Sequence, residues 1–466
     1  MPMSPTPTPL SLPSLRAAVD GRVITPDDPD YDAARTVAVG GIDRRPAAIV
    51  RAANATDVAR VVGIARETGL ELAVRSGGHS GAGHGVTEGG IVLDLSAMRR
   101  IEVDVEGRTA WAEAGLTAGE LTGALHAHGL AVGFGDTGSV GIGGITVGGG
   151  VGYLVRKHGL TIDSLLAADV VTATGKLVRA DLDSHPDLFW AIRGGGGNFG
   201  VVTRFLFRLH EVRTIVGGML ILPATAETIA GFIAAAEAAP EELSTIANVM
   251  PAPPMPFVAP EHHGKLVVMA LLAHAGDTEA GKRAMAPFRA LAEPIADMVR
   301  SMPYPEIYPS VDAEYHPLAV AQTMFLDHIG RDEAAALLAR LQASDASMRV
   351  AQLRVLGGAM ARVPADATAF AHRASRILVV VAAFHDGSPE DRARRQAWVD
   401  ELAATLRQDD RGAYVNFLGD EGEARVRAAY PGTTWDRLAA VKRRYDPTNL
   451  FHLNQNIPPG ATSAQR

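Results

Sequence analysis

Residues 74–83, VRSGGHSGAG, form a glycine-rich stretch that decides the fold and places His79 directly after two glycines. The apolar segments LELAV at 70–74 and IVLDL at 91–95 are typical of short buried strands. Glycine adopts positive φ without strain and lets a ligand approach the main chain closely. We therefore expect His79 in a strand-to-strand loop beside a bound ligand.

A helix precedes the first of these strands. Thr56 predicts its N-terminal cap and Gly69 its end, and the apolar residues between them fall on one helical face: Val58, Val61, Val62 and Ala65. Residues 111–130 repeat the pattern of a strand followed by a capped helix. Alternating strands and helices predict a mixed α/β protein.

Composition limits the class of protein. The chain has 466 residues with 47% hydrophobic content, which predicts two domains, and its formal net charge of -8 disfavours nucleic acid and anionic membranes as partners. The stretch from residue 1 to 23 is broken by prolines, unlike a signal peptide, and no run reaches the roughly 18 apolar residues that span a bilayer. We expect a soluble, cytoplasmic protein.

The chain has no cysteine, which excludes disulfides, thiolate metal sites and cysteine nucleophiles. The histidines at 126–128 and 262–263 have no third ligand at metal-binding spacing, so we predict no metal site. A metal shared by His79 and His84 stays open as an alternative.

Residues 133–152, GFGDTGSVGIGGITVGGGVG, are the richest in glycine. A flexible linker would be polar, whereas this stretch has interleaved Val and Ile and continues into structured sequence. We interpret it as a loop whose backbone N–H groups face an anion.

Residues 195–200 match the dinucleotide pattern G-x-G-x-x-G. That pattern requires a helix after the glycines, but the following VVTRFLFRL alternates like a strand, so we expect no Rossmann nicotinamide site. Just before it, residues 165–181 predict two strands around a Thr-Gly turn.

From about residue 214 the chain changes to alanine-rich helices and proline-rich joints, which indicates a second domain running to about residue 410. Within it, GDTEAGKR at 276–283 approaches a P-loop, but Arg283 replaces the hydroxyl that would hold magnesium. A capped strand-to-helix loop is the better interpretation.

Four motifs occur in order: VRSGGHSGAG, the glycine-rich run from 138, DLFWAIRGGGGNFGVVTRFLFRL, and YVNFLGD with YDPTNLFHLNQNIPP. Together they resemble the FAD-linked oxidases of the berberine bridge enzyme-like group, within the vanillyl-alcohol oxidase or p-cresol methylhydroxylase (PCMH) flavoprotein superfamily. The resemblance implies an α+β fold with a two-part PCMH-type FAD-binding domain at 1–213 (core about 43–213). It also implies a substrate domain at 214–410, with an antiparallel sheet covered by helices, and a segment at 411–466 that returns to the FAD domain.

The resemblance implies that His79 is bonded covalently to FAD. Relatives with two covalent bonds have a cysteine where this chain has Thr137, so a single bond is expected here. The implied cofactor-binding residues are Arg75, Ser76, Gly77, Gly78, His79, Ser80, Thr137, Gly138, Ser139, Val140, Gly141, Gly143, Gly144, Gly148, Gly152, Asn198, Gly200, Val202, Tyr414, Asn416, Asn454 and Asn456.

The resemblance also implies chemistry. Flavin accepts a hydride from an activated C–H bond, and Tyr414 matches a residue that faces flavin and substrate in relatives, where it is a candidate catalytic base. An aromatic side chain packed on the ring is the alternative for Tyr414. Asn416, Asn454 and Asn456 could donate hydrogen bonds to the flavin or be ordinary turn residues.

Val140 occupies a position where valine in relatives admits molecular oxygen, which favours an oxidase that releases hydrogen peroxide. A dehydrogenase with another acceptor and a non-oxidase flavoprotein are the alternatives. The substrate would be a small secondary metabolite or a sugar. Residues 356–373 resemble a substrate-facing strand that brings His372 or Arg373 toward the pocket, and the glutamate base of some plant relatives has no clear equivalent there.

Overall fold

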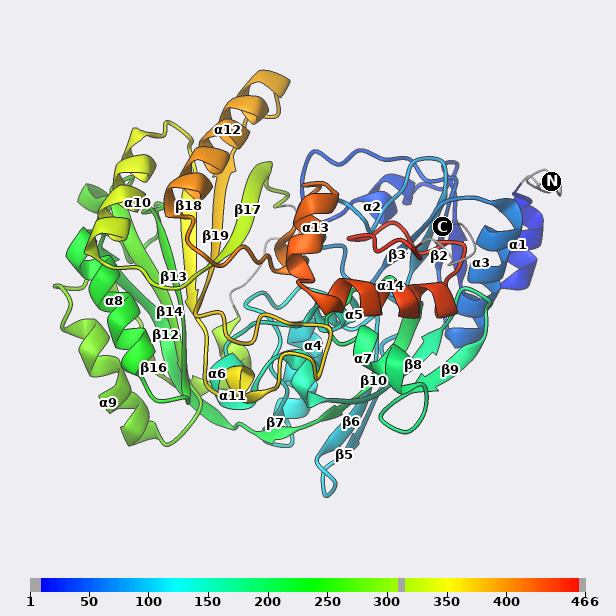
Figure 1. The fold of residues 1–466 in the computed structure, drawn as a ribbon, viewed down its shortest axis with the longest axis horizontal. Helices are drawn as coiled ribbons and strands as arrows, with labels where there is room; N and C mark the ends of the chain where they lie inside the picture. The colour runs from blue at the N-terminus through cyan, green and yellow to red at the C-terminus, as the bar shows by residue number, and fades with distance from the viewer. Residues whose placement is uncertain (1–9, 309–314, 461–466) are drawn as a thin grey trace.

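The computed structural model describes residues 10–308 and 315–460, and its strands form three main sheets (Figure 1). The first sheet has the order β1-β2-β4-β3, in which β2, β4 and β3 are parallel and β1 is antiparallel. Its strands are β1 (Arg22–Ile24), β2 (Ala48–Arg51), β3 (Leu72–Arg75) and β4 (Ile91–Asp94). The helices beside it are α1 (Leu12–Ala18), α2 (Tyr31–Arg35) and α3 (Ala55–Thr68).

The second sheet is antiparallel, with the order β5-β6-β10-β8-β9. Its strands are β5 (Ile101–Asp104), β6 (Thr109–Glu113), β8 (Leu165–Val171), β9 (Leu177–Ala180) and β10 (Val201–Arg208). The chain between these strands forms α4 (Ala118–His126), α5 (Ile142–Gly148), α6 (Val155–His158), a 3-10 turn η1 (Thr161–Ser164) and α7 (Pro186–Ala191). A small pair joins β7 (Leu130–Ala131) to β11 (His210–Glu211).

The third sheet is antiparallel and has eight strands in the order β15-β12-β14-β13-β18-β19-β17, with β16 paired to β12. They are β12 (Thr214–Pro223), β13 (Leu243–Pro251), β14 (Leu266–His274), β15 (Ala296–Asp297), β16 (Arg300–Pro303), β17 (Ala319–Leu326), β18 (Arg349–Val355) and β19 (Ile377–Phe384). Four helices cover one face: α8 (Ala226–Ala238), α9 (Thr278–Arg289), α10 (Arg331–Ala343) and α12 (Pro389–Leu406). Short turns η2 (Pro260–His262) and η3 (Tyr304–Ile307) complete this part.

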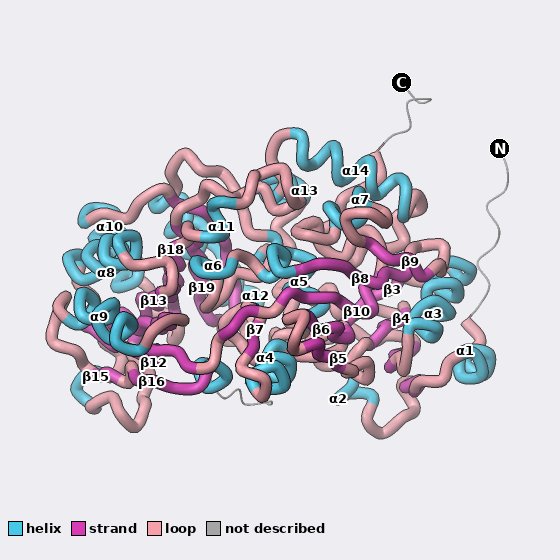
Figure 2. The backbone as a smooth tube through the Cα atoms, turned by 90° about the horizontal axis from the view of Figure 1, so that it is seen from below, coloured by secondary structure: helices cyan, strands magenta, loops and turns pink. Residues whose placement is uncertain are grey.

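The eight-stranded sheet lies at one end of the molecule and the first two sheets at the other (Figure 2). One large hydrophobic core includes residues of the first two sheets and of the C-terminal segment, and a second lies between the third sheet and its helices. The C-terminal elements return to the end that contains the first two sheets. They are η4 (Val415–Phe417), α13 (Glu423–Ala429) and α14 (Thr433–Tyr445), and α14 packs on α7. Among the described residues, no helix combines the length and apolar character needed to cross a membrane.

The expected α+β class is confirmed, and several local predictions can be compared with it. The loop that contains His79 connects β3 and β4 as predicted, and a strand, β10, follows the glycines at 195–200. Asp277 caps α9 through a hydrogen bond from the Ala280 N–H, as expected of a strand-to-helix loop. Gly69 ends α3 at φ 70°, but the N-terminal cap is Asn54 rather than Thr56, because Asn54 accepts the Asp57 N–H.

One local prediction is wrong. Residues 356–373 do not form a strand, because Gly357 and Gly358 have φ of 103° and 61°, which end the extended conformation of β18. The chain instead forms a short helix, α11 (Ala359–Arg362), and an irregular segment. His372 and Arg373 are buried there: Arg373 makes a bidentate pair with Asp163 at 2.8 Å, and neither lines the cavity described below.

Candidate cofactor and active site

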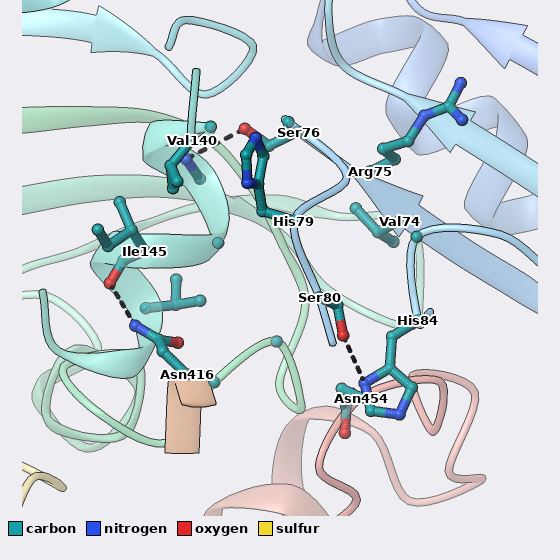
Figure 3. A pocket seen from close by; sticks show the side chains of 18 of the residues that line it. Val74, Arg75, Ser76, His79, Ser80, His84, Val140, Ile145, Asn416 and Asn454 are labelled. Atoms are coloured by element: carbon teal, nitrogen blue, oxygen red, sulfur yellow. Dashed lines mark hydrogen bonds between the residues drawn. The ribbon is translucent and has the colours of Figure 1, made fainter. Parts of the chain in front are cut away.

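A cavity of about 400 Å³ lies where the loops of the first two sheets meet the C-terminal segment. Four stretches line it: the loop after β3, the residues up to and within α5, the start of β10, and the C-terminal segment from Tyr414 to Gln455 (Figure 3). The predicted residues that line the cavity are Arg75, Ser76, Gly77, Gly78, His79, Ser80, Thr137, Val140, Gly141, Gly143, Gly144, Gly200, Val202, Tyr414, Asn416 and Asn454.

His79 lies in the cavity wall beside Val140 (Figure 3). Its Nε2 is 3.1 Å from Ser139 Oγ, so this ring nitrogen has a polar partner. Burial lowers the pKa of His79, and a hydrogen bond that the imidazole donates to the Ser139 backbone opposes that shift only in part. The imidazole is therefore neutral at pH 7 and keeps a nitrogen lone pair.

The main chain around His79 is arranged for close contacts. Gly78 has φ of 69°, which a side chain would strain, and a Cβ on Gly77 would lie 2.2 Å from the backbone nitrogen of Gly141. In the part of the chain that the structure describes, none of residues 77–80 donates its backbone N–H to an acceptor. Unpaired N–H groups on a cavity wall favour an anionic ligand such as a pyrophosphate.

Tyr414 precedes the 3-10 turn η4, and its hydroxyl accepts two hydrogen bonds. The donors are the Gly150 N–H at 2.8 Å and Asn416 Nδ2 at 2.9 Å. Asn416 Nδ2 also donates to the Ile145 carbonyl at 3.0 Å, so the amide is held against α5. Burial raises the pKa of Tyr414, while the hydrogen bonds from Gly150 and Asn416 oppose the rise by stabilising the phenolate.

A buried ion pair fixes the C-terminal wall of the cavity. Lys442 and Asp446 are fully buried, and Lys442 Nζ donates to Asp446 Oδ2 at 2.6 Å, to the Asn198 carbonyl at 2.8 Å and to the Phe451 carbonyl at 2.9 Å. The Asn198 side chain donates to the Gln455 carbonyl and accepts the Ile457 N–H. These contacts join the loop before β10 to the C-terminal segment, and we name the three residues Asn198, Lys442 and Asp446 the polar knot.

Six predicted cofactor residues do not line the cavity: Gly138, Ser139, Gly148, Gly152, Asn198 and Asn456. Ser139 contacts His79, and Asn198 belongs to the polar knot. The two glycines permit close packing, because a Cβ on Gly148 would lie 1.9 Å from Asn416 Oδ1 and one on Gly152 would lie 1.5 Å from the Phe134 carbonyl oxygen. These residues support the wall from behind.

Three polar lining residues were not predicted as cofactor residues: His84, Asp136 and Gln455. His84 lies 3.4 Å through Nδ1 from Ser80 Oγ, and burial together with nearby Arg44 lowers its pKa to about 4 (Figure 3). His84 directly follows the glycine-rich stretch that contains His79, and this position in the sequence could have indicated a lining residue. Asp136 directly precedes Thr137 and pairs with Arg354 of β18, a partner that no spacing in the sequence indicates.

Models of two protein families match this chain. A FAD binding domain matches residues 46–181, and a berberine and berberine-like segment matches residues 413–458. Both matched regions contribute residues to the cavity.

Two relatives that match most of the chain are named as oxidases. The chain is 32% identical to (R)-6-hydroxynicotine oxidase from Paenarthrobacter nicotinovorans, over 95% of this chain and 97% of the relative. It is 29% identical to xylooligosaccharide oxidase from Thermothelomyces thermophilus, over 89% of this chain and 87% of the relative. The crystal structure of 6-hydroxy-D-nicotine oxidase from Arthrobacter nicotinovorans superposes with a TM-score of 0.83 at 30% identity, covering 95% of this chain and 98% of that one.

The residues present fit FAD. The free backbone N–H groups of residues 77–80 suit a pyrophosphate, and the buried Oδ1 atom of the lining residue Asn454 has no hydrogen-bond partner within the described ranges. Such orphaned acceptors suit the N–H or O–H groups of a flavin or ribose. With two flavoprotein family segments and whole-length relatives in agreement, the chain belongs to the berberine bridge enzyme-like family of FAD-linked oxidoreductases.

Proposed function

We propose that this protein is an FAD-dependent oxidase that takes a hydride from an activated C–H bond of a small organic molecule and gives the electrons to molecular oxygen, forming hydrogen peroxide. The observation that carries the proposal is the meeting of His79, the unpaired N–H groups of residues 77–80 and the doubly hydrogen-bonded Tyr414 around one cavity. When bound, FAD supplies the two-electron acceptor, and the residues of the chain bind, orient and deprotonate the substrate.

His79 holds the cofactor covalently. Its neutral imidazole has a nitrogen outside the Ser139 hydrogen bond, and this nitrogen is available to bond a carbon of the flavin. Thr137 has no thiol, so the attachment is single. The unpaired N–H groups of residues 77–80 bind the pyrophosphate, and the glycines of 141–144 let the cofactor approach the start of α5.

Acid denaturation tests the covalent attachment. The yellow colour should stay with the polypeptide in the parent protein and be released from His79→Ala, while the exposed His128→Ala control should keep it. Colour released from the fully loaded parent would contradict the attachment, and a purified protein with no flavin at all would contradict the proposed function.

Tyr414 is the catalytic base. A phenolate at this position would receive hydrogen bonds from the Gly150 N–H and Asn416 Nδ2, which is the arrangement that favours loss of the hydroxyl proton. The two donors occupy two acceptor positions of the Tyr414 oxygen, so a phenolate keeps one further acceptor position for the substrate proton.

Val140 supports oxygen as the electron acceptor, since it lines the cavity beside His79 with a small side chain. After anaerobic reduction by a substrate, admission of air should restore the oxidised absorbance within seconds, and Val140→Leu should slow this step. Reoxidation that takes many minutes in the parent would favour the second candidate, a dehydrogenase with another acceptor.

The remaining assignments follow the same proposal. The FAD part comprises residues 1–213 and 411–466, and residues 214–410 contribute the substrate part, in agreement with two separate main cores. The relatives' names, hydroxynicotine oxidase and xylooligosaccharide oxidase, favour a small secondary metabolite or a sugar as substrate. The absence of cysteine is compatible with a cytoplasmic location.

A further inference from the structure

The eight-stranded sheet presents a second wall to the cavity region. On β13, β18, β19 and β17, alternate residues pack on the helices, and the residues between them face the FAD part. We name this face the sheet wall; on these four strands its middle comprises Asn248, Val350, Gln352, Arg354, Val380, Ala382, Ala321 and Thr323. Arg354 is the charged residue of this set, and the others are small, apolar or neutral polar side chains.

Arg354 is buried, and its guanidinium nitrogens donate several hydrogen bonds. Its NH2 donates to Asp136 Oδ2 at 2.7 Å and to Gln352 Oε1 at 2.6 Å, and its NH1 donates to the Val151 carbonyl at 3.2 Å. The guanidinium also lies 5.0 Å from the centre of the Phe417 ring. Asp136, Val151 and Phe417 all line the cofactor cavity, so one side chain of the sheet wall reaches three of its segments.

Asp136 keeps a carboxylate oxygen for a ligand. Arg354 binds Oδ2, while Oδ1 has a single weak contact within the described residues, Thr137 Oγ1 at 3.5 Å. The side chain is 22% exposed and lines the cavity, whereas Arg354 is 4% exposed behind it. A substrate therefore meets the carboxylate and not the guanidinium.

Gln352 has a fixed direction beside this pair. Arg354 holds its Oε1, and its Nε2 donates to Asn248 Oδ1 at 2.9 Å; Asn248 in turn donates to the Met269 carbonyl at 3.3 Å. This chain of bonds prevents the Gln352 amide from turning its oxygen to a ligand. Asp136 is thus the acceptor available to a ligand where the cavity meets the sheet wall.

We propose that Asp136 anchors the substrate by accepting a hydrogen bond from a hydroxyl or protonated amine, and that it rejects substrates with a carboxylate in this place. The proposal rests on the proposed function, because the cavity must hold FAD for the substrate to lie against it. Asp136 has a binding role, and the proton of the reaction goes to Tyr414 on a different loop. Arg354 acts through Asp136 as a positioning residue.

The test uses the flavin-loaded protein and three probes with one ring and different head groups: benzylamine, benzyl alcohol and benzoate. Dissociation constants are measured from the change in flavin absorbance on titration. Benzoate is titrated without turnover, and benzylamine and benzyl alcohol are titrated under anaerobic conditions. We expect benzylamine and benzyl alcohol to bind more tightly than benzoate. Asp136→Ala should weaken both by at least about tenfold, as for a hydrogen bond to a charged group, and should strengthen benzoate.

Asp136→Asn separates the two head groups, because its amide keeps an acceptor oxygen but has no charge: benzyl alcohol should lose less affinity than benzylamine. Asp183→Asn, at an exposed site, should change nothing. Equal affinity for benzoate and benzylamine, an unchanged ratio in Asp136→Ala, or no binding of any probe would overturn the role of Asp136. Absence of flavin from the purified protein, visible before any titration, would instead overturn the proposed function and the role of Asp136 with it.

Discussion

The cofactor wall and the sheet wall are built in different ways. The cofactor wall comprises the loops that line the cavity around residues 77–80 and Gly141. A Cβ on Gly77 would lie 2.2 Å from the Gly141 nitrogen, and the N–H groups of residues 77–80 have no acceptor within the described residues. The sheet wall is a regular surface whose character depends on which side chains alternate along β18 and β19. From this difference we expect the noncovalent cofactor contacts to depend mainly on backbone shape, and the choice of substrate to depend on side chains of the sheet wall.

Two of the ion pairs repeat the contrast. Lys442 and Asp446 are both completely buried behind the cofactor wall, and neither lines the cavity. Arg354 and Asp136 lie between the two walls, and Asp136 remains partly exposed to the cavity. The first pair therefore has a purely structural position, and the second can meet a ligand.

The largest expected effect comes from the polar knot. Lys442→Met leaves Asp446 buried without its cation and should lower the free energy of unfolding by about 3–5 kcal/mol. Thermal unfolding and the flavin content of the purified protein measure this effect. The exposed Lys282→Met should stay within about 0.5 kcal/mol of the parent, and an equally small change for Lys442→Met would break the comparison.

The next effect concerns the reaction. Tyr414→Phe removes the base and should slow flavin reduction by about 10²–10⁴-fold, measured by anaerobic stopped-flow absorbance. Because burial raises the pKa of Tyr414, the parent rate should increase with pH through the alkaline range, and the variant should lose this dependence. Tyr430→Phe is a matched control, since Tyr430 is equally buried but donates to the Gly194 carbonyl outside the reaction. Similar rates for both variants would leave Tyr414 as a packing residue.

The smallest effect sharpens the description of the sheet wall. Ala382→Val adds two methyl groups on the face toward the cavity, so we expect a several-fold change in KM with stability within about 0.5 kcal/mol of the parent. Ala383→Val adds the same groups on the helix-covered face, where overpacking should cost about 1–3 kcal/mol and leave KM unchanged. The same response at both positions would show that the two faces do not differ as described.

Much of the cofactor wall could be predicted from the sequence because glycines record backbone shape directly. Gly77, Gly78 and Gly141 occur where a Cβ would collide or the dihedral angle would be strained. The glycine motif in the sequence therefore directly indicates this backbone geometry. The strand after residues 195–200 was predictable for a similar reason, since alternating β-formers contradict a helix.

Other parts depend on distant contacts that no local pattern contains. The pairing of Asp136 with Arg354 joins residues separated by more than two hundred positions, and the polar knot joins Asn198 to α14. Residues 356–373 were expected to form a strand, but two glycines with positive φ end β18 and redirect the chain. The position of His84 was visible in the sequence, whereas its burial and lowered pKa arise from Arg44 and the surrounding fold.

The polar knot also sets an order of events during synthesis. His79 leaves the ribosome long before Gln455, and at about 5–20 residues per second the interval is on the order of tens of seconds. Until Gln455 and Ile457 are made, the Asn198 side chain lacks its two contacts with the C-terminal segment. The cavity wall is therefore completed only when residues near 455 have been made, so we expect stable binding of the cofactor late in synthesis.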